Sequence, residues 1–211
     1  FLGAVLTIGA VYSLARVGKI VPLTTLILAG VALGSLTSAL TSLVIMLTEN
    51  VVYQALTFLY GGSSVAGWEP IKIAVPYFLS GLIMLSFSGH ALNVLQFGEE
   101  QAQQMGLSVE KVKIAIILAA SLTTAAAVSF SGVIGFIGLV VPHIIRLVWG
   151  GDYRKLIPLS ILGGAFALLV SDLAARIILA PQTLPVGIVT AMIGAPFFLW
   201  ILRRAKQEVF W

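Results

Sequence analysis

Seven long apolar segments, separated by short polar stretches, dominate the pattern of the chain. They cover approximately residues 1–15, 23–48, 71–89, 112–130, 134–149, 156–180 and 187–202. A membrane-spanning helix needs about 20 apolar residues, and its backbone groups must find their hydrogen bonds within the segment. The alternating ten-residue pattern of barrel strands does not occur. We therefore predict an all-α, polytopic transmembrane helix bundle with about seven spans, in which 134–149 is a partial or tilted span.

Composition supports a membrane environment. The 211 residues are 59% hydrophobic and 9% charged, against about 25% charged in an ordinary soluble domain. A soluble core of this size cannot absorb so much apolar surface, so we expect the chain to be surrounded by membrane lipid. The chain has no cysteine, which excludes disulfides and thiolate metal sites. It starts at Phe1 inside an apolar segment, and we expect it to be part of a longer polypeptide.

The basic residues indicate which side of the membrane each loop faces. If the loop of Arg16 and Lys19 is cytoplasmic, alternating the segments places ten of the twelve basic residues inside and only Lys72 and Arg176 outside. The other inner residues are Lys111, Lys113, Arg146, Arg154, Lys155, Arg203, Arg204 and Lys206. This asymmetry follows the positive-inside rule. The net charge of +4 is therefore a topology signal rather than a nucleic-acid site, and the C-terminal Trp211 is expected inside.

The longest polar interruption, residues 89–111, lies on the predicted cytoplasmic side. Within it, Glu99 to Gln104 is predicted to form a short helix bounded by Gly98 and Gly106, and Ser108 is a candidate N-cap for the next helix. Taken alone, such a loop is more often a solvated connector. The alternative is a helix presented to a cytoplasmic partner.

Ionisable residues within the apolar segments are few, and such residues are functional candidates by default. They are Asp172 and Arg176, together with Glu49 near a helix end. Asp172 and Arg176 are four residues apart, so they share one helical face and can pair. The pair either lowers the cost of inserting two charges or serves a partner outside the membrane.

The segment that starts at Pro22 is rich in hydroxyl side chains. They belong to Thr24, Thr25, Ser35, Thr37, Ser38, Thr41 and Ser42. Serine and threonine in a membrane helix can bond to backbone carbonyls or to neighbouring helices. The same mild polarity without fixed charge also suits a helix that lines a translocation pathway.

Glycine and histidine do not form a catalytic or cofactor motif here. Gly132, Gly135 and Gly138 lack the preceding strand and the acidic partner of a dinucleotide site, and we expect them, with Pro142, to serve helix packing. The only two histidines lie in separate loops, so we expect no metal site. The phosphate-binding pattern GxxxxGK[ST] does not occur in the sequence. Any ATP hydrolysis must then come from a partner chain.

Three motifs, in this order, resemble the FecCD-type permease subunits of bacterial ABC importers for iron–siderophores, haem and cobalamin. They are IGFIGLVVPHIIRL (134–147), the Asp172–Arg176 segment, and LPVGIVTAMIGAPFFLWIL (184–202). The resemblance implies a type II ABC importer permease, which has ten spanning helices. Seven helices beginning outside would match the last seven of these. Residues 1–211 would then form one transmembrane permease domain with about three N-terminal helices missing.

The resemblance also implies a function, a location and partners. The chain would form the pathway for an iron–siderophore, haem or cobalamin-type metal chelate in the bacterial cytoplasmic (inner) membrane. It would not be an enzyme and would bind no cofactor. A second permease copy would complete a homodimer, two cytoplasmic ATPase subunits would bind ATP and Mg, and an extracytoplasmic substrate-binding protein would deliver the cargo.

Residue roles implied by the resemblance fall in three places. The loop 89–111 would be the ATPase-coupling loop, through Gly98, Glu99, Glu100, Gln101, Ala102 and Gly106. Arg176 would help to dock the binding protein, and Leu23, Thr24 and Thr25 are the gate candidates. The alternative function is an ion-coupled secondary transporter, which usually needs an intramembrane carboxylate such as Asp172 or a broken helix as its coupling site.

Overall fold

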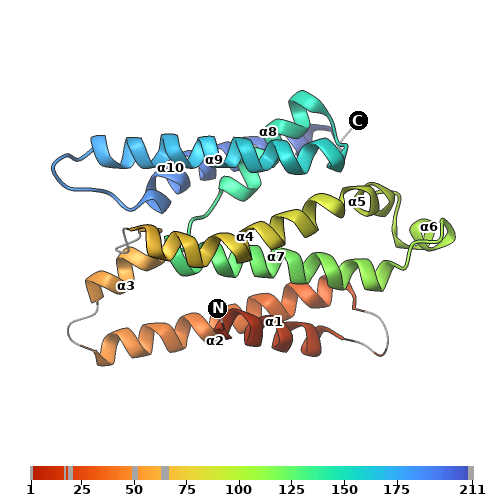
Figure 1. The fold of residues 1–211 in the computed structure, drawn as a ribbon, viewed down its shortest axis with the longest axis horizontal. Coiled ribbons are helices and arrows are strands. Elements are labelled where there is room, and N and C mark those ends of the chain that lie inside the picture. Colours follow the sequence, from red (N-terminus) through yellow and green to blue (C-terminus); the bar gives the residue numbers. More distant parts are fainter. Residues whose placement is uncertain (1, 17, 19–20, 49–51, 63–66, 209–211) are drawn as a thin grey trace. The chain divides into compact units, whose positions relative to one another are not determined.

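The computed structural model describes residues 2–16, 18, 21–48, 52–62 and 67–208, and in this part of the chain helices joined by turns and loops are the regular secondary structure (Figure 1). Lys19 and Glu49 lie outside the described residues. The helices are α1 (Leu2–Ala15), α2 (Leu23–Leu47), α3 (Val52–Leu59), α4 (Trp68–Phe87), α5 (Gly89–Leu95), α6 (Glu99–Gln104), α7 (Val109–Ser131), α8 (Ile137–Trp149), α9 (Tyr153–Ile177) and α10 (Val186–Glu208).

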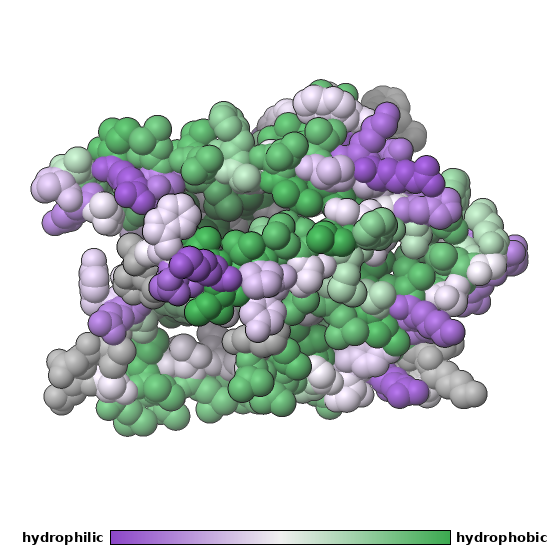
Figure 2. All heavy atoms as spheres, in the orientation of Figure 1, coloured by the Kyte–Doolittle hydropathy of each residue, from purple (hydrophilic) through white to green (hydrophobic). Residues whose placement is uncertain are grey.

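Each of the seven apolar segments forms a helix, which confirms the predicted all-α fold. Among the described residues, α2, α4, α7 and α9 are long and apolar enough to cross a membrane, and α1, α8 and the apolar part of α10 are shorter. Figure 2 shows an apolar surface over much of the visible face, with hydrophilic residues mostly near helix ends. The two short helices α3 and α5 were not expected from the sequence.

The chain divides into two compact units. The first contains Phe1–Leu56 and Val65–Phe130, and the second contains Thr57–Ser64 and Ser131–Trp211. In the first unit, α1 packs beside α2, and α4 approaches α7 closely at Gly81. A Cβ at Gly81 would collide with the hydroxyl of Thr123 and would lie 3.0 Å from the carbonyl oxygen of Ala119. Only glycine therefore lets these two helices come so near.

The second unit is built on a hairpin of α8 and α9. Its core consists of Val141, Ile145 and Leu156, which are 8%, 6% and 6% exposed. Asp152 caps the start of α9, where its carboxylate accepts a hydrogen bond from the backbone nitrogen of Arg154 at 3.0 Å. The helix α10 packs on both α8 and α9, and Gly194 leaves room there for the ring of Phe136.

Three segments that are far apart in the sequence meet through backbone hydrogen bonds in the second unit. We call this group the three-segment junction; it consists of Phe58–Gly61, Gly132–Ile134 and Val186–Gly187. The nitrogens of Val133, Val186 and Gly187 donate to the carbonyl oxygens of Phe58, Gly61 and Tyr60 at 3.0, 3.1 and 2.9 Å. The end of α3 is thus fixed between the turn after α7 and the start of α10.

Candidate functional site

The predicted helix in the loop 89–111 is confirmed as α6, with the expected bounds. It follows α5, and both lie at the ends of α4 and α7 in the first unit (Figure 1). Gly98 and Gly106, which flank α6, have φ of 101° and 84°. The backbone of a residue with a side chain rarely adopts these positive φ values, so the two glycines allow the chain to turn sharply into and out of α6.

An ion pair ties α6 to α7. Lys113 Nζ lies 2.6 Å from Glu99 Oε2 and 3.6 Å from Glu110 Oε1. The Lys113 side chain is 21% exposed, against 49% for Glu99. Ala102 is fully buried, and its carbonyl oxygen accepts a hydrogen bond from Leu107 N at 3.0 Å. One face of α6 is therefore held by the protein itself.

The remaining surface of the loop combines polar and large apolar side chains. Glu100, Gln101 and Gln104 are exposed, and Phe97 and Met105, on either side of α6, are 67% and 61% exposed. Large apolar side chains exposed on a polar loop are typical of protein-binding surfaces.

The second candidate position is the ion pair near the end of α9. Arg176 donates to Asp172 through Nε–Oδ2 at 2.7 Å and Nη2–Oδ1 at 3.3 Å, so the predicted pairing on one helical face is confirmed. The Arg176 side chain is mostly exposed, at 65%, and that of Asp172 is partly exposed, at 42%. At about 1.5 Å rise per residue, Arg176 lies roughly 34 Å along α9 from Tyr153. Arg146 meets Tyr153 at that other end, with Nη2 3.0 Å from the phenol oxygen.

Four of the hydroxyls of α2 bond within their own helix. Ser35, Thr37, Thr41 and Ser42 each donate to a backbone carbonyl three or four residues earlier, at 2.8 to 3.0 Å. This confirms the backbone alternative for these four side chains. The gate candidates Leu23, Thr24 and Thr25 share the first turn of α2, where Leu23 and Thr24 are exposed and Thr25 is half-buried.

The glycines singled out for helix packing behave differently from one another. Gly132 follows the end of α7 with φ of 73°, and a Cβ there would collide with the carbonyl oxygen of Phe58. Its close contact is therefore made by a turn, not by a helix face. Gly135 and Gly138 have no described atom within 4 Å of where a Cβ would be. Pro142 lies inside α8 and is half-buried.

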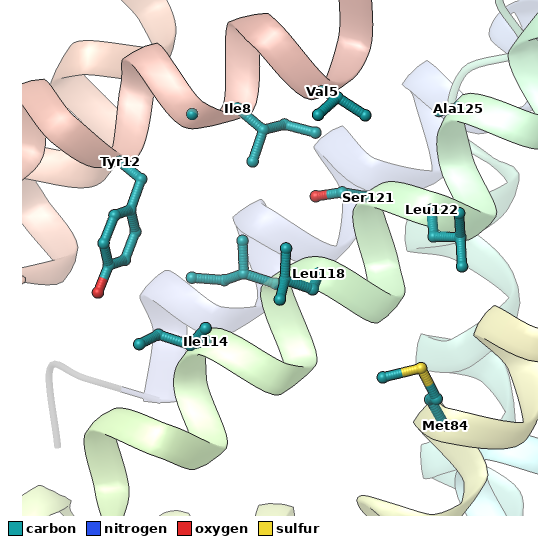
Figure 3. A pocket seen from close by; sticks show the side chains of 11 residues that line it. Val5, Ile8, Tyr12, Met84, Ile114, Leu118, Ser121, Leu122 and Ala125 are labelled. Atoms are coloured by element: carbon teal, nitrogen blue, oxygen red, sulfur yellow. The ribbon is translucent and has the colours of Figure 1, made fainter. Parts of the chain in front are cut away.

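An apolar pocket of about 420 Å³ lies in the first unit between α1, α4 and α7 (Figure 3). Val5 and Ile8 of α1, Met84 of α4 and Leu118 of α7 line it, and Tyr12 and Ser121 are the polar residues of its lining. Nothing in the sequence marked this pocket, because its lining residues belong to the general apolar pattern of the three helices. The described residues contain no group of three or more acidic or histidine side chains that could hold a metal ion.

Comparison with known proteins identifies the family. The model of the FecCD transport family matches residues 1–204. The chain belongs to the FecCD transport family. Together with the apolar helices, this membership shows a multi-pass membrane protein of the ABC permease type.

The relatives are named as permeases of several substrates. An uncharacterized ABC transporter permease protein, YvrB of Bacillus subtilis, is 45% identical over 97% of this chain and 58% of its own length. The cobalamin import system permease protein BtuC of Halobacterium salinarum is 41% identical over 96% of this chain and 54% of its own. The hemin transport system permease protein HmuU of Yersinia pestis is 36% identical over 99% of this chain and 62% of its own length. The chain thus spans a little over half of the length of these relatives.

A solved structure has the same fold. It is described as an inward-facing conformation of a metal-chelate type ABC transporter. The two structures superpose with a TM-score of 0.80, and their sequences are 32% identical. The match covers 86% of this chain and 59% of the other chain. The fold of this chain is therefore shared with that protein over the matched range.

Proposed function

We propose that the chain is the membrane-spanning permease part of an ABC importer, and that it forms the pathway for a metal chelate of the siderophore, haem or cobalamin class. The observation that carries this proposal is the match of the FecCD family over residues 1–204. The names of the relatives support the cargo class. ATP would be hydrolysed, with Mg, on a partner ATPase, and this chain would do no covalent chemistry and bind no cofactor.

The proposed arrangement in the membrane has seven spans, corresponding to the last seven of a ten-helix permease, within one permease domain over residues 1–211. Its cytoplasmic side carries the loop 89–111, the α8–α9 turn and the C-terminus. The opposite ends of α9 support this topology, since the basic residues Arg146 and Arg154 lie near one end and Arg176 near the other. Two permease copies would work with two ATPase subunits and an extracytoplasmic binding protein in the bacterial inner membrane.

Transport would follow from two conformations that fit the partners differently. ATP-driven closure of the ATPases would move α6, and α6 would move α7, to which Lys113 ties it. The first turn of α2, with Leu23, Thr24 and Thr25, would open or close the inner end of the pathway. On the outer side, Arg176 would meet acidic side chains of the binding protein.

The alternative of an ion-coupled transporter has less support. A coupling carboxylate must exchange a proton or an ion as the protein changes conformation. Asp172 is bonded twice to Arg176 of the same helix, so both of its carboxylate oxygens already have a cationic partner.

The test is to purify the full-length parent permease in detergent with the ATPase encoded beside it. Wild type should retain the ATPase, and Glu99→Arg/Glu100→Arg should release it. The matched control is Glu69→Arg, which reverses another exposed carboxylate on the predicted outer side. If a folded wild-type parent never retains an ATPase, the importer proposal is wrong and transport coupled to ions through Asp172 becomes the hypothesis to test.

A further inference from the structure

We propose that Lys113 is the positioning residue of the coupling loop, and that it divides the two neighbouring glutamates of α6 into an internal one and a partner-facing one. This inference rests on the proposed ATPase partner. Glu99 would fix α6 to α7, and Glu100 would contact the ATPase together with Phe97 and Met105.

The contacts of Lys113 give the first argument. Its ammonium group is flanked by two carboxylates, Glu99 at 2.6 Å and Glu110 at 3.6 Å. Glu110 is on the same helix as Lys113, so this contact orients the lysine side chain but does not link α7 to another helix. Glu99 is on α6, fourteen residues away, so among the described residues this is the ion pair that fixes α6 against α7.

Helix geometry gives the second argument. Ala102 is fully buried and marks the inward face of α6. Residues two positions before and after it are turned by about 200° around the helix axis, which places Glu100 and Gln104 on the opposite, outward face. Both are exposed. The ion pair with Lys113 keeps Glu99 at the edge of the inward face, so a rotation of α6 would have to break it.

The apolar residues give the third argument. Phe97 and Met105 lie one or two positions outside the two ends of α6, and most of each side chain is exposed. Aromatic residues and methionine are enriched in the centres of protein interfaces, and a few of them carry most of the binding energy. The partner surface that fits has apolar pockets for Phe97 and Met105, with a cationic or N–H donor group between them for Glu100.

A movement of the ATPase could reach the spanning helix α7 only if α6 does not roll in its place. The Lys113–Glu99 pair supplies this rigidity across a loop in which two glycines permit rotation on either side. Lys113 would therefore affect both how tightly the ATPase binds and how many ATP molecules are hydrolysed per cargo moved. It need not touch the ATPase itself.

The experiment measures ATPase affinity and the ratio of ATP hydrolysed to cargo transported for the full-length parent in lipid nanodiscs. Lys113→Met should weaken ATPase binding by about tenfold and raise the ratio, because α6 can roll. The matched control is Lys111→Met, two residues away and exposed, which should change affinity less than about twofold. Met105→Ala should weaken binding by a further measurable factor, whereas Met46→Ala, at an exposed methionine of α2, should not.

A charge reversal separates positioning from simple loss of a positive charge. Glu99→Lys with Lys113→Glu restores the pair in the opposite sense, and Glu110→Gln is added so that a carboxylate at position 113 is not repelled. Recovery to within about threefold of wild-type affinity is expected. Unchanged binding in Lys113→Met, or no recovery in the reversed variant while the melting temperature is normal, overturns the role of Lys113 and leaves the importer proposal standing. If wild type itself binds no ATPase, both are wrong.

Discussion

The carbonyl oxygen of Tyr60 accepts a hydrogen bond from the backbone nitrogen of Gly187 at 2.9 Å, which joins the end of α3 to the first turn of α10. A Cβ at position 187 would collide with this same oxygen and would lie 3.1 Å from the carbonyl oxygen of Val133. The three-segment junction therefore depends on a missing side chain as much as on its hydrogen bonds.

We expect Gly187→Ala to destabilise the parent permease, even though alanine is the better helix former. The new methyl group meets two backbone oxygens that cannot move independently, and overpacking of this kind costs about 1–3 kcal/mol. The loss of stability is measured as a lower melting temperature in detergent. Gly138→Ala, in a helix with open space beside the glycine, serves as the control and should be neutral or stabilising. Equal melting temperatures for the two variants would contradict the proposed packing.

The close approach of α4 and α7 can be tested with a second substitution that removes the colliding atom. Gly81→Ala should lower the melting temperature, because its methyl group meets the Thr123 hydroxyl, which already bonds to the Ala119 carbonyl at 2.8 Å. Combining it with Thr123→Ala removes the colliding atom and should recover part of the loss, since residues in contact are not additive. Gly34→Ala, with no atom near its Cβ position, is the matched control. Simple additivity of the two changes would show that the helices do not touch there.

Two adjacent isoleucines of α8 should differ sharply. Ile145 is 6% exposed and packs in the core of the α8–α9 hairpin, whereas Ile144 is 42% exposed. Ile145→Ala should cost about 2–4 kcal/mol of unfolding free energy, in the range of large-to-small core changes, and Ile144→Ala should cost less than about 1 kcal/mol. Denaturant unfolding of the parent compares them, and the opposite order would place the hairpin in the wrong register.

Binding-protein docking should depend on Arg176 more than on a comparable exposed cation. Arg176→Ala is expected to weaken capture of the binding protein by about tenfold, more at low than at high salt, because charge attraction is screened. Lys72→Ala removes another exposed, ion-paired cation on the predicted outer side and should have less than about a twofold effect. Surface binding assays with the parent in nanodiscs would measure the affinity of the binding protein for each variant. Identical affinities for wild type and Arg176→Ala would remove Arg176 from the docking surface.

Local features of the fold can be predicted from the sequence, and particular residues show why. The bounds of α6 follow from Gly98 and Gly106, because glycine ends a helix by its own conformational freedom. The Asp172–Arg176 pair follows from a spacing of four on one helix. The seven apolar segments become helices because a backbone in lipid must bond within its own segment.

Contacts between distant segments could not be predicted in this way. Gly135 and Gly138 were expected to serve helix packing and have no described atom near their Cβ positions, while Gly81 makes a close contact without any neighbouring pattern. A glycine is identical in sequence whether a neighbour approaches it or not, and only the position of the other helix decides. The pairing of Glu99 with Lys113 was missed for the same reason, since it depends on how the chain turns after Gly106.

The hydroxyls of α2 have a consequence for whatever lies beside this helix. A hydroxyl has one proton to donate, and Ser35, Thr37, Thr41 and Ser42 each give theirs to a carbonyl of their own helix. What remains on their oxygens is lone pairs. At these four positions a neighbouring molecule would meet oxygens that accept hydrogen bonds and have no proton left to donate. These four oxygens would attract, weakly, the N–H and O–H groups or the bound water of a solute, and they offer no donor to its carboxylates and phosphates.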